Sequence, residues 1–233
     1  MVAITLCGTC RLKSIRDTFN GCHLINYPHC TKEVIQYIKF FTKELLFPFP
    51  YSFLCFRVGV DRGVQFRCED AYTPAFWDTD TFVIEICSRK KYIHNGFYLH
   101  HTCVDTRPLH SNPIILARTP KEITDNHTVE TQTDEEIEGD ILEIQRMVHP
   151  RKIVIVSHYN SKMNGEYIPA RNDLITLLGT VCEKHDISFV NPTEVLSAFP
   201  QEQVMDPDLG HYTELGVREF SNYMNNYLKE CDV

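Results

Sequence analysis

Two short segments near opposite ends of the chain carry side chains that could do chemistry together. Near the start, Cys10 follows an apolar run and a glycine in Gly8-Thr9-Cys10-Arg11. Near the end, Asp208 and His211 stand three residues apart, just before the last amphipathic segment. A cysteine is a nucleophile when a base lies within hydrogen-bond reach, and a carboxylate can hold that base in one tautomer. These residues therefore predict nucleophilic catalysis by Cys10, with His211 as the base and Asp208 as its support.

Each of these residues also has a purely structural interpretation. Cys10 fits a buried thiol at a tight glycine turn, because cysteine is among the most buried residue types. Asp208 fits a turn residue, with Thr213 capping the helix that follows. If a helix begins near Ser14, however, Cys10 lies close to its N-terminus, where N–H groups and the helix dipole favour a thiolate.

A third polar group follows the apolar segment Phe82-Val-Ile-Glu-Ile86. Ser88 is the candidate donor to a developing oxyanion at this position. Arg89 could pair with a carboxylate or phosphate of a substrate, although arginines at strand ends are usually surface residues. Arg11, next to Cys10, is a further candidate for oxyanion or substrate binding.

Short apolar runs alternate with helical segments along the chain, and this order predicts a parallel sheet. The predicted strands span residues 2–7, about 52–58, 81–87, 152–157 and 187–190. The runs at 81–87 and 152–157 are almost continuously apolar, as expected for central strands covered on both faces. We therefore expect an α/β fold, a three-layer α/β/α sandwich with a five-stranded parallel sheet. In such a sheet ligands gather at the carboxyl ends of the strands, which is where Cys10 and Ser88 fall.

Four amphipathic helices and one irregular stretch complete the predicted architecture. The helices span residues 31–46, from Thr133 onward, about 170–185, and 214–229. Thr133 and Glu136 have the spacing of a capping box, so the acidic cluster at 134–140 is interpreted as a solvated helix start rather than a metal site. Residues 93–131 lack a sustained period and exceed an ordinary connection. We expect an insertion there, with loops and one short hairpin, that sets substrate specificity within a single domain spanning 1–233.

Composition excludes several classes of protein. The 233 residues carry a net charge of −8 and no basic stripe longer than Arg89-Lys90-Lys91, which argues against nucleic-acid binding. No apolar run approaches the roughly 20 residues that span a bilayer. The apolar start lacks a basic flank and predicts a strand rather than a signal peptide. Ten irregularly spaced cysteines indicate reduced thiols, and hence a cytoplasmic location.

Taken together, the opening and closing motifs resemble those of the GDSL/SGNH hydrolase superfamily. That family opens with Gly-Asp-Ser and closes with Asp-x-x-His; here Gly8-Thr9-Cys10 places cysteine at the nucleophile position, and Asp208 and His211 match the closing pair. The cysteine is closer to GSCFA-type proteins and to capsule polysaccharide acetyltransferases that open with Gly-Asn-Cys-Gln. The resemblance implies a flavodoxin-like sheet and acyl transfer or ester hydrolysis, with a carbohydrate or related hydroxyl as acceptor. It implies no tightly bound cofactor and acyl-CoA as a possible co-substrate.

The sequence departs from the family pattern in its middle blocks. The family's third block supplies an asparagine, whereas the matching strand end reads Cys87-Ser88-Arg89. Asn26 or His29 falls where the second block would line the pocket, although His29 could equally cap the helix that starts at Thr31. His158 follows the strand at 152–157, and Arg171 lies on the helix after it. Both are weaker candidates for the same crevice.

Two alternatives to an enzyme remain open from the sequence. One is a catalytically inactive binding module of the same fold, for carbohydrate or protein, in which Cys10 packs and His211 only caps. The other is metal binding by residues of the irregular stretch, namely His94, His100, His101, Cys103 and His110. Their spacing matches no standard metal site, and adjacent histidines in a strand would point to opposite faces. The sequence therefore predicts no metal.

Overall fold

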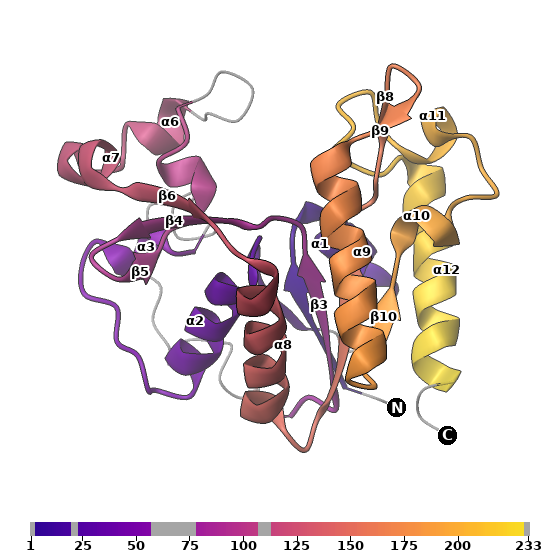
Figure 1. The fold of residues 1–233 in the computed structure, drawn as a ribbon, viewed down its shortest axis with the longest axis horizontal. Coiled ribbons are helices and arrows are strands. Elements are labelled where there is room, and N and C mark those ends of the chain that lie inside the picture. Colours follow the sequence, from indigo (N-terminus) through magenta and orange to yellow (C-terminus); the bar gives the residue numbers. More distant parts are fainter. Residues whose placement is uncertain (1–2, 20–22, 57–77, 107–112, 231–233) are drawn as a thin grey trace. The chain divides into compact units, whose positions relative to one another are not determined.

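The computed structural model describes residues 3–19, 23–56, 78–106 and 113–230. The chain forms two compact units, shown in Figure 1. The first unit contains residues 1–25, 78–88 and 150–233, and the second contains 26–77 and 89–149. The expectation of one domain spanning 1–233 stays a prediction.

A five-stranded sheet organises the first unit, in the order β10-β7-β3-β1-β2. Its strands are β1 (Ile4–Gly8), β2 (His23–Asn26), β3 (Thr81–Ile86), β7 (Lys152–Ser157) and β10 (Ser188–Val190). The pairs β1–β3, β3–β7 and β7–β10 are parallel, with Leu6 beside Val83 and Val83 beside Val154. The α/β fold is thus confirmed, with four strands in parallel pairings and β2 next to β1.

One predicted strand is wrong. Helix α3 (Tyr51–Leu54) includes residues 52–54 of the run predicted as a strand at about 52–58, and residues 57 and 58 lie outside the described ranges. The sheet takes β2 instead, from a segment that the sequence analysis left unassigned. Short apolar runs are ambiguous because periodicity alone does not separate a buried strand from a buried helical turn.

Helices cover both faces of this sheet. They are α1 (Cys10–Ile15), η1 (Arg16–Thr18), α9 (Pro169–Lys184), α10 (Pro192–Val195), α11 (Gln201–Val204) and α12 (Glu214–Glu230). Leu6, Val83 and Val154 share a buried core with apolar residues of α1 and α12. On the other face, the ring of Phe189 lies against Gly179 of α9. The helices expected at 170–185 and 214–229 are confirmed. A hairpin of β8 (Lys162–Met163) and β9 (Glu166–Tyr167) precedes α9.

The second unit packs two helices beside a small antiparallel sheet. The helices α2 (Thr31–Phe41) and α8 (Asp134–Val148) contact each other. The buried carboxylate of Asp140 joins them by accepting hydrogen bonds from Thr31 Oγ1 and Lys32 Nζ, both at 2.6 Å. The sheet has the order β5-β4-β6, with β4 (Lys90–His94), β5 (Phe97–Tyr98) and β6 (Thr128–Thr131).

The irregular stretch at 93–131 contains more regular structure than expected. The hairpin β4–β5 confirms the predicted hairpin, and its turn places Asn95 and Gly96 at φ 49° and 79°, the left-handed conformation that Asn-Gly turns favour. Beyond it lie η2 (His101–Cys103), α6 (Pro113–Leu116) and α7 (Lys121–Asn126). These short helices replace part of the predicted loop.

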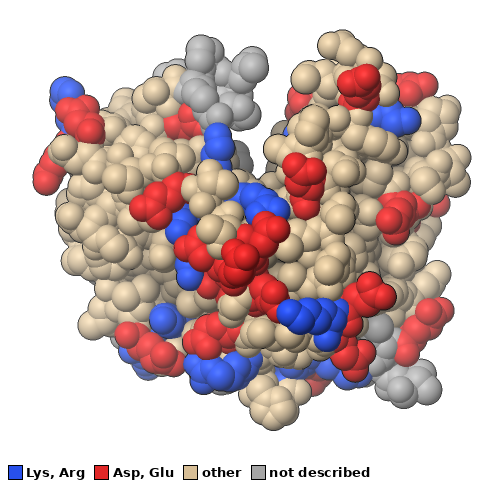
Figure 2. All heavy atoms as spheres, in the orientation of Figure 1, with Lys and Arg blue, Asp and Glu red and all other residues tan. Residues whose placement is uncertain are grey.

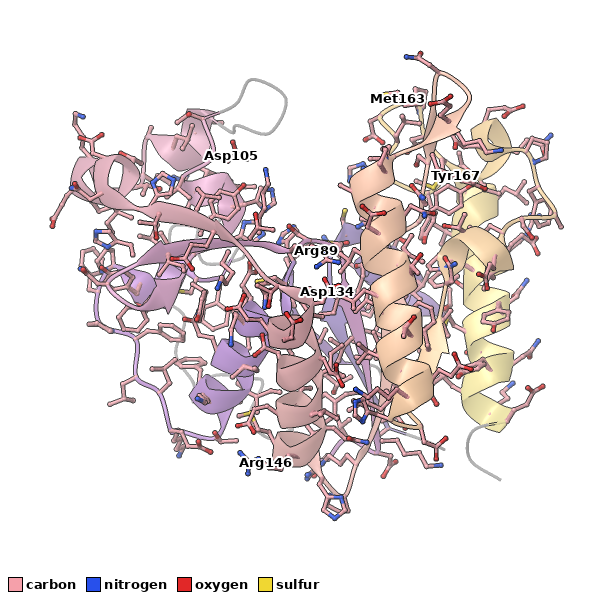
Figure 3. All side chains as sticks on the ribbon, viewed as in Figure 1. Arg89, Asp105, Asp134, Arg146, Met163 and Tyr167 are labelled. Atoms are coloured by element: carbon pink, nitrogen blue, oxygen red, sulfur yellow. The ribbon has the colours of Figure 1, made fainter. Side chains whose placement is uncertain are left out.

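The acidic start of α8 is a capped and solvated helix end, as expected. Thr133 and Glu136 form the complete capping box. Hydrogen bonding from the Thr133 backbone and then from Lys91 lowers the pKa of Glu136. Arg89 pairs with Asp134, as Figure 3 shows. Figure 2 shows acidic side chains gathered over this first turn, with basic side chains beside them.

Two further sequence predictions concern membranes and thiols. Among the described residues, no helix has both the length and the apolar character needed to cross a bilayer. None of the cysteines within the described ranges forms a disulfide.

Candidate active site

Cys10 stands at the junction between the first strand and the first helix. The strand β1 ends at Gly8, and α1 begins at Cys10 itself, which is half-buried. Gly8 has no room for a side chain, because a Cβ there would lie 2.6 Å from Glu85 Cβ and 2.7 Å from Leu12 Cδ1. The glycine therefore allows β1 to approach Glu85 closely and fixes where the Cys10 turn begins.

The residue between them, Thr9, is held by the same carboxylate. Its N–H and its hydroxyl donate to Glu85 Oε2 at 2.8 and 2.6 Å. Thr9 precedes α1 but makes no side-chain capping bond, since its hydroxyl is engaged by Glu85. The first N–H groups of a helix have no partner within the helix. At Cys10 such groups are donors of the kind that stabilise an oxyanion.

Asp208 and His211 form a hydrogen-bonded pair. Asp208 Oδ2 lies 2.5 Å from His211 Nδ1, and Oδ1 accepts from the N–H groups of Gly210 and His211 at 2.8 and 3.1 Å. Partial burial would raise the pKa of Asp208, but the hydrogen bonds from Gly210 and His211 outweigh it and lower the pKa. The ionised carboxylate thus orients the imidazole and directs Nε2 away from itself. Thr213 accepts from Gly216 N at 3.2 Å, so it caps α12 as expected while Asp208 serves the histidine.

The loop carrying this pair is tied down at both ends. Met205 and Tyr212 form an isolated antiparallel bridge, and Asp206 N donates to His211 O at 2.9 Å. Leu209 adopts φ 56°, a region that side-chain-bearing residues rarely occupy. Its carbonyl accepts from Ser161 Oγ at 3.3 Å and from Arg171 Nη1 at 3.4 Å. The surrounding contacts therefore hold the loop in a conformation that it would not favour alone.

Arg11 connects the Cys10 turn to the histidine loop. Its Nε donates to Glu85 Oε1 at 2.8 Å, Nη1 to the carbonyl of Gly210 at 3.0 Å, and Nη2 to Thr9 Oγ1 at 3.1 Å. The side chain is only 5% exposed. Burial opposes the charge of Arg11, but Glu85 outweighs it, so the pKa of the guanidinium is raised. Three of the five N–H donors of Arg11 are thus engaged within the protein. The expectation that Arg11 binds substrate or an oxyanion stays a prediction.

Tyr212, the residue that follows His211, is buried, and burial raises the pKa of its hydroxyl. Its ring packs edge-on against Tyr159 and at a tilt against Phe220 of α12. The His211 loop is thus anchored to the core by Tyr212 and to the Cys10 turn by the hydrogen bond from Arg11 to Gly210.

The remaining predicted residues divide between the units. Ser88 is half-buried two residues beyond β3, in the unit that holds Cys10. His158 is buried after β7, with Nδ1 2.6 Å from the carbonyl of Tyr159. Asn26, His29 and Arg89 belong to the second unit. Arg89 has a structural partner in Asp134, and the side chain of Asn26 lies outside the described part of the chain.

One residue of this site, Glu85, was not predicted from the sequence. Glu85 lies on the central strand β3 and is 1% exposed. The signal was a carboxylate within an apolar run, because a buried charge needs a partner. Arg171, a weaker sequence candidate, donates from α9 to the carbonyl of Leu209 at 3.4 Å. Burial and then the nearby charge of Arg11 lower the pKa of Arg171.

The parallel sheet, with Cys10 after its first strand and the Asp208–His211 pair before its last helix, has an SGNH hydrolase-like fold. Two crystal structures share this fold. A lipase/acylhydrolase from Enterococcus faecalis aligns with 99% of this chain and 96% of its own, at a TM-score of 0.53 and 9% identity. A candidate acylhydrolase from Bacteroides fragilis aligns with 98% and 86%, at a TM-score of 0.50 and 10% identity.

The family model described as the TviD N-terminal domain matches residues 2–112 and 115–228, and the chain belongs to this family. The chain is also 23% identical to the Vi polysaccharide biosynthesis protein TviD of Salmonella typhi, over 92% of its own length. It spans only 30% of that relative.

Proposed function

We propose that this chain is an acyltransferase or ester hydrolase that works through Cys10, with His211 as base and Asp208 as its support. The observation that carries the proposal is the 2.5 Å contact between Asp208 and His211, on a loop that Arg11 ties to the Cys10 turn. A nucleophile, a base and an oriented carboxylate in one unit are the parts that acyl transfer requires.

The proposed reaction has two steps. His211 takes the thiol proton of Cys10, and the thiolate attacks the acyl carbon. The resulting oxyanion is stabilised by the first N–H groups of α1, with Ser88 as a further candidate donor. The donor's leaving group, the thiol of an acyl-CoA or an alcohol, departs with the proton from His211. In the second step His211 deprotonates an acceptor hydroxyl, which attacks the thioester and releases Cys10, whose sulfur takes back the proton.

We infer that the acceptor is a carbohydrate hydroxyl in transfer, or water in hydrolysis. The relative TviD is described by its role in polysaccharide biosynthesis, which supports a sugar acceptor. A cavity of about 440 Å³ in the first unit offers a place for it, with Tyr159, Lys162, Tyr167 and Gln201 among its lining residues. Tyr159 packs edge-on against Tyr212, the neighbour of His211, and Figure 3 shows Tyr167 on the β8–β9 hairpin. An aromatic wall with a few polar groups suits a small organic ligand.

A cytoplasmic location remains part of this proposal, as does acyl-CoA as co-substrate. The irregular spacing of the cysteines and the absence of disulfides among those described support a reducing compartment.

The experiment is an acyl-transfer assay with acetyl-CoA or an activated acetyl ester as donor, in the presence and absence of oligosaccharide acceptors. We expect Cys10→Ala and His211→Ala to lose activity by at least about a hundredfold. Cys87→Ser is the matched control, because Cys87 is equally half-buried and lies just beyond β3. It should keep the activity of the natural chain. Activity in Cys10→Ala equal to that in Cys87→Ser would refute Cys10 as the nucleophile. No activity of the natural chain with any donor would refute the enzyme and favour a binding module.

Tyr167 tests the acceptor site separately. Tyr167→Ala should raise the KM for a sugar acceptor by about tenfold, since it removes one aromatic wall, and should leave hydrolysis of a small ester unchanged. Tyr223→Ala is the control, because Tyr223 is a similarly exposed tyrosine on α12. A KM that moves equally in both variants would exclude the cavity as the acceptor site.

A further inference from the structure

Three histidines converge in the second unit, away from any role in the proposed reaction. His29 lies two residues before α2, His100 caps η2, and His101 is the first residue of η2. One ring nitrogen from each lies within 4.8 Å of the others. The ring centroids are 4.2 Å apart for His29 and His101, 4.8 Å for His29 and His100, and 4.7 Å for His100 and His101.

The local backbone explains why two adjacent histidines share one side. Sequence analysis discounted a metal on the ground that adjacent residues in a strand point to opposite faces. His100 and His101 do not lie in a strand; they begin a 3-10 helix, and their rings stack at 29°. The argument against their cooperation was therefore wrong.

The other residues considered as metal ligands in the irregular stretch at 93–131 do not join this cluster among the described residues. His94 Nδ1 is 2.6 Å from the hydroxyl of Tyr51, and Cys103 Sγ lies 3.2 Å from the carbonyl of Leu54. His110 falls outside the described residues. The three histidines that converge include His29, which is distant in sequence from the other two.

One ring has a hydrogen-bond partner of the kind that orients metal ligands, and a second has a carboxyl group nearby. His100 Nδ1 is 2.7 Å from Thr102 Oγ1; when the ring donates this bond, the lone pair is on Nε2. In that tautomer Nδ1 carries the hydrogen, so the ring loses only the longer hydrogen bond that Nδ1 would accept from Thr102 N, at 3.3 Å. The carboxyl group of Glu33, 1% exposed, accepts from the backbone N–H of His29 at 3.1 Å and lies 3.8 Å from His29 Nδ1, beyond hydrogen-bond distance. Metal-bound histidines usually donate their second ring N–H to a carboxylate, hydroxyl or carbonyl, as His100 does to Thr102 in this tautomer.

We propose that His29, His100 and His101 bind one divalent transition-metal ion of the zinc type, with Glu33 and Thr102 orienting the first two rings. Neutral imidazole is the common nitrogen ligand of such ions. Tetrahedral Zn–N bonds of about 2.0–2.1 Å place ligand nitrogens about 3.4 Å apart, so the rings close by little more than 1 Å on binding. A bound ion joins segments about 70 residues apart and thereby stabilises the second unit.

The test begins with the natural chain, stripped of metal by a chelator and titrated with cobalt(II). We expect one equivalent to bind and to give visible d–d bands without the near-ultraviolet band of a thiolate ligand. Zinc should displace cobalt and bleach these bands. At zinc a hundredfold above Kd, the melting temperature should rise by about 5–10 °C.

Variants locate the site. His29→Ala and His101→Ala should weaken cobalt binding by at least about a hundredfold, and Glu33→Gln by about tenfold. His149→Ala is the matched control, because His149 is an exposed histidine of the same unit. It should bind cobalt as the natural chain does.

Several results would overturn the proposal. They are the absence of d–d bands from the natural chain at one equivalent of cobalt, a thiolate charge-transfer band, and unchanged binding by His29→Ala. The first two are measured on the natural chain, so they decide the matter even where a variant does not fold. Three rings that pack only against one another would give the first result.

Discussion

The link between the Cys10 turn and the histidine loop can be broken at Arg11. Arg11→Met removes three hydrogen bonds, one of them to Glu85. The carboxylate of Glu85, which is 1% exposed, then keeps the two donors of Thr9 and, among the described residues, loses its cation. Removing one partner of a buried ion pair typically costs about 3–5 kcal/mol, because the other charge stays buried without compensation. We expect a loss of that size in the free energy of unfolding, measured by urea titration followed by circular dichroism.

Arg11→Lys separates positioning from stability. Lysine keeps the cation, but one ammonium group cannot replace the guanidinium fork that reaches Glu85, Gly210 and Thr9 together. Losing the Gly210 contact should cost about 1 kcal/mol of stability. Because that contact holds the loop of His211, kcat for acyl transfer should fall by about a hundredfold with little change in KM.

The control is Arg218→Met, which removes an exposed arginine paired with Glu219 on α12. It should leave stability and kcat unchanged within error. The reasoning is refuted if Arg11→Met costs less than about 1 kcal/mol, or if Arg11→Lys retains the full kcat.

Three further predictions follow from the same geometry. Gly8→Ala should lower the free energy of unfolding by about 1–3 kcal/mol in urea titration, because the added Cβ has no room. Gly139→Ala is the control: it has open space around it on α8 and should raise the free energy of unfolding by about 0.5–1 kcal/mol. Equal effects of the two substitutions would contradict the close approach of Glu85 to Gly8. Asp208→Asn should lower kcat by about a hundredfold. Hydrogen bonds lower the pKa of Asp208 below its ordinary 3.8, so the carboxylate should support His211 above that pH and lose this role only below it. A step in the pH–activity profile well above pH 4, present in the natural chain and absent from Asp208→Asn, would contradict this assignment. Burial raises the pKa of Cys182 to about 12, so at pH 8 only about one Cys182 thiol in ten thousand is ionised. A disulfide reagent should therefore label Cys10 long before Cys182, as measured by peptide mass mapping. Comparable labelling rates would contradict the burial of Cys182.

The parts that the sequence predicted well are those with local signals. The spacing of Thr133 and Glu136 predicts the start of α8, and the continuous apolar runs of β3 and β7 predict buried parallel strands. Asp208 and His211 could be paired from their spacing because both lie on one short loop.

The parts that it missed depend on contacts between distant residues. The strand β2 carries no pattern that separates it from a loop, and residues 52–54 of the apolar run predicted as a strand at about 52–58 fold as part of helix α3. Nothing local in the sequence reveals that Arg11 pairs with Glu85, which is 74 residues away. The histidine cluster likewise needs His29 and His100 to meet from two separate segments.

The most direct test of the central claim is the covalent intermediate. The natural chain is incubated with acetyl-CoA or an activated ester, quenched in acid, and measured by intact mass and peptide mapping. We predict one acetyl group, on Cys10, which accumulates in the absence of a sugar acceptor and does not form in His211→Ala. An acetyl group on any other residue, or none on the natural chain with any donor, would contradict the account.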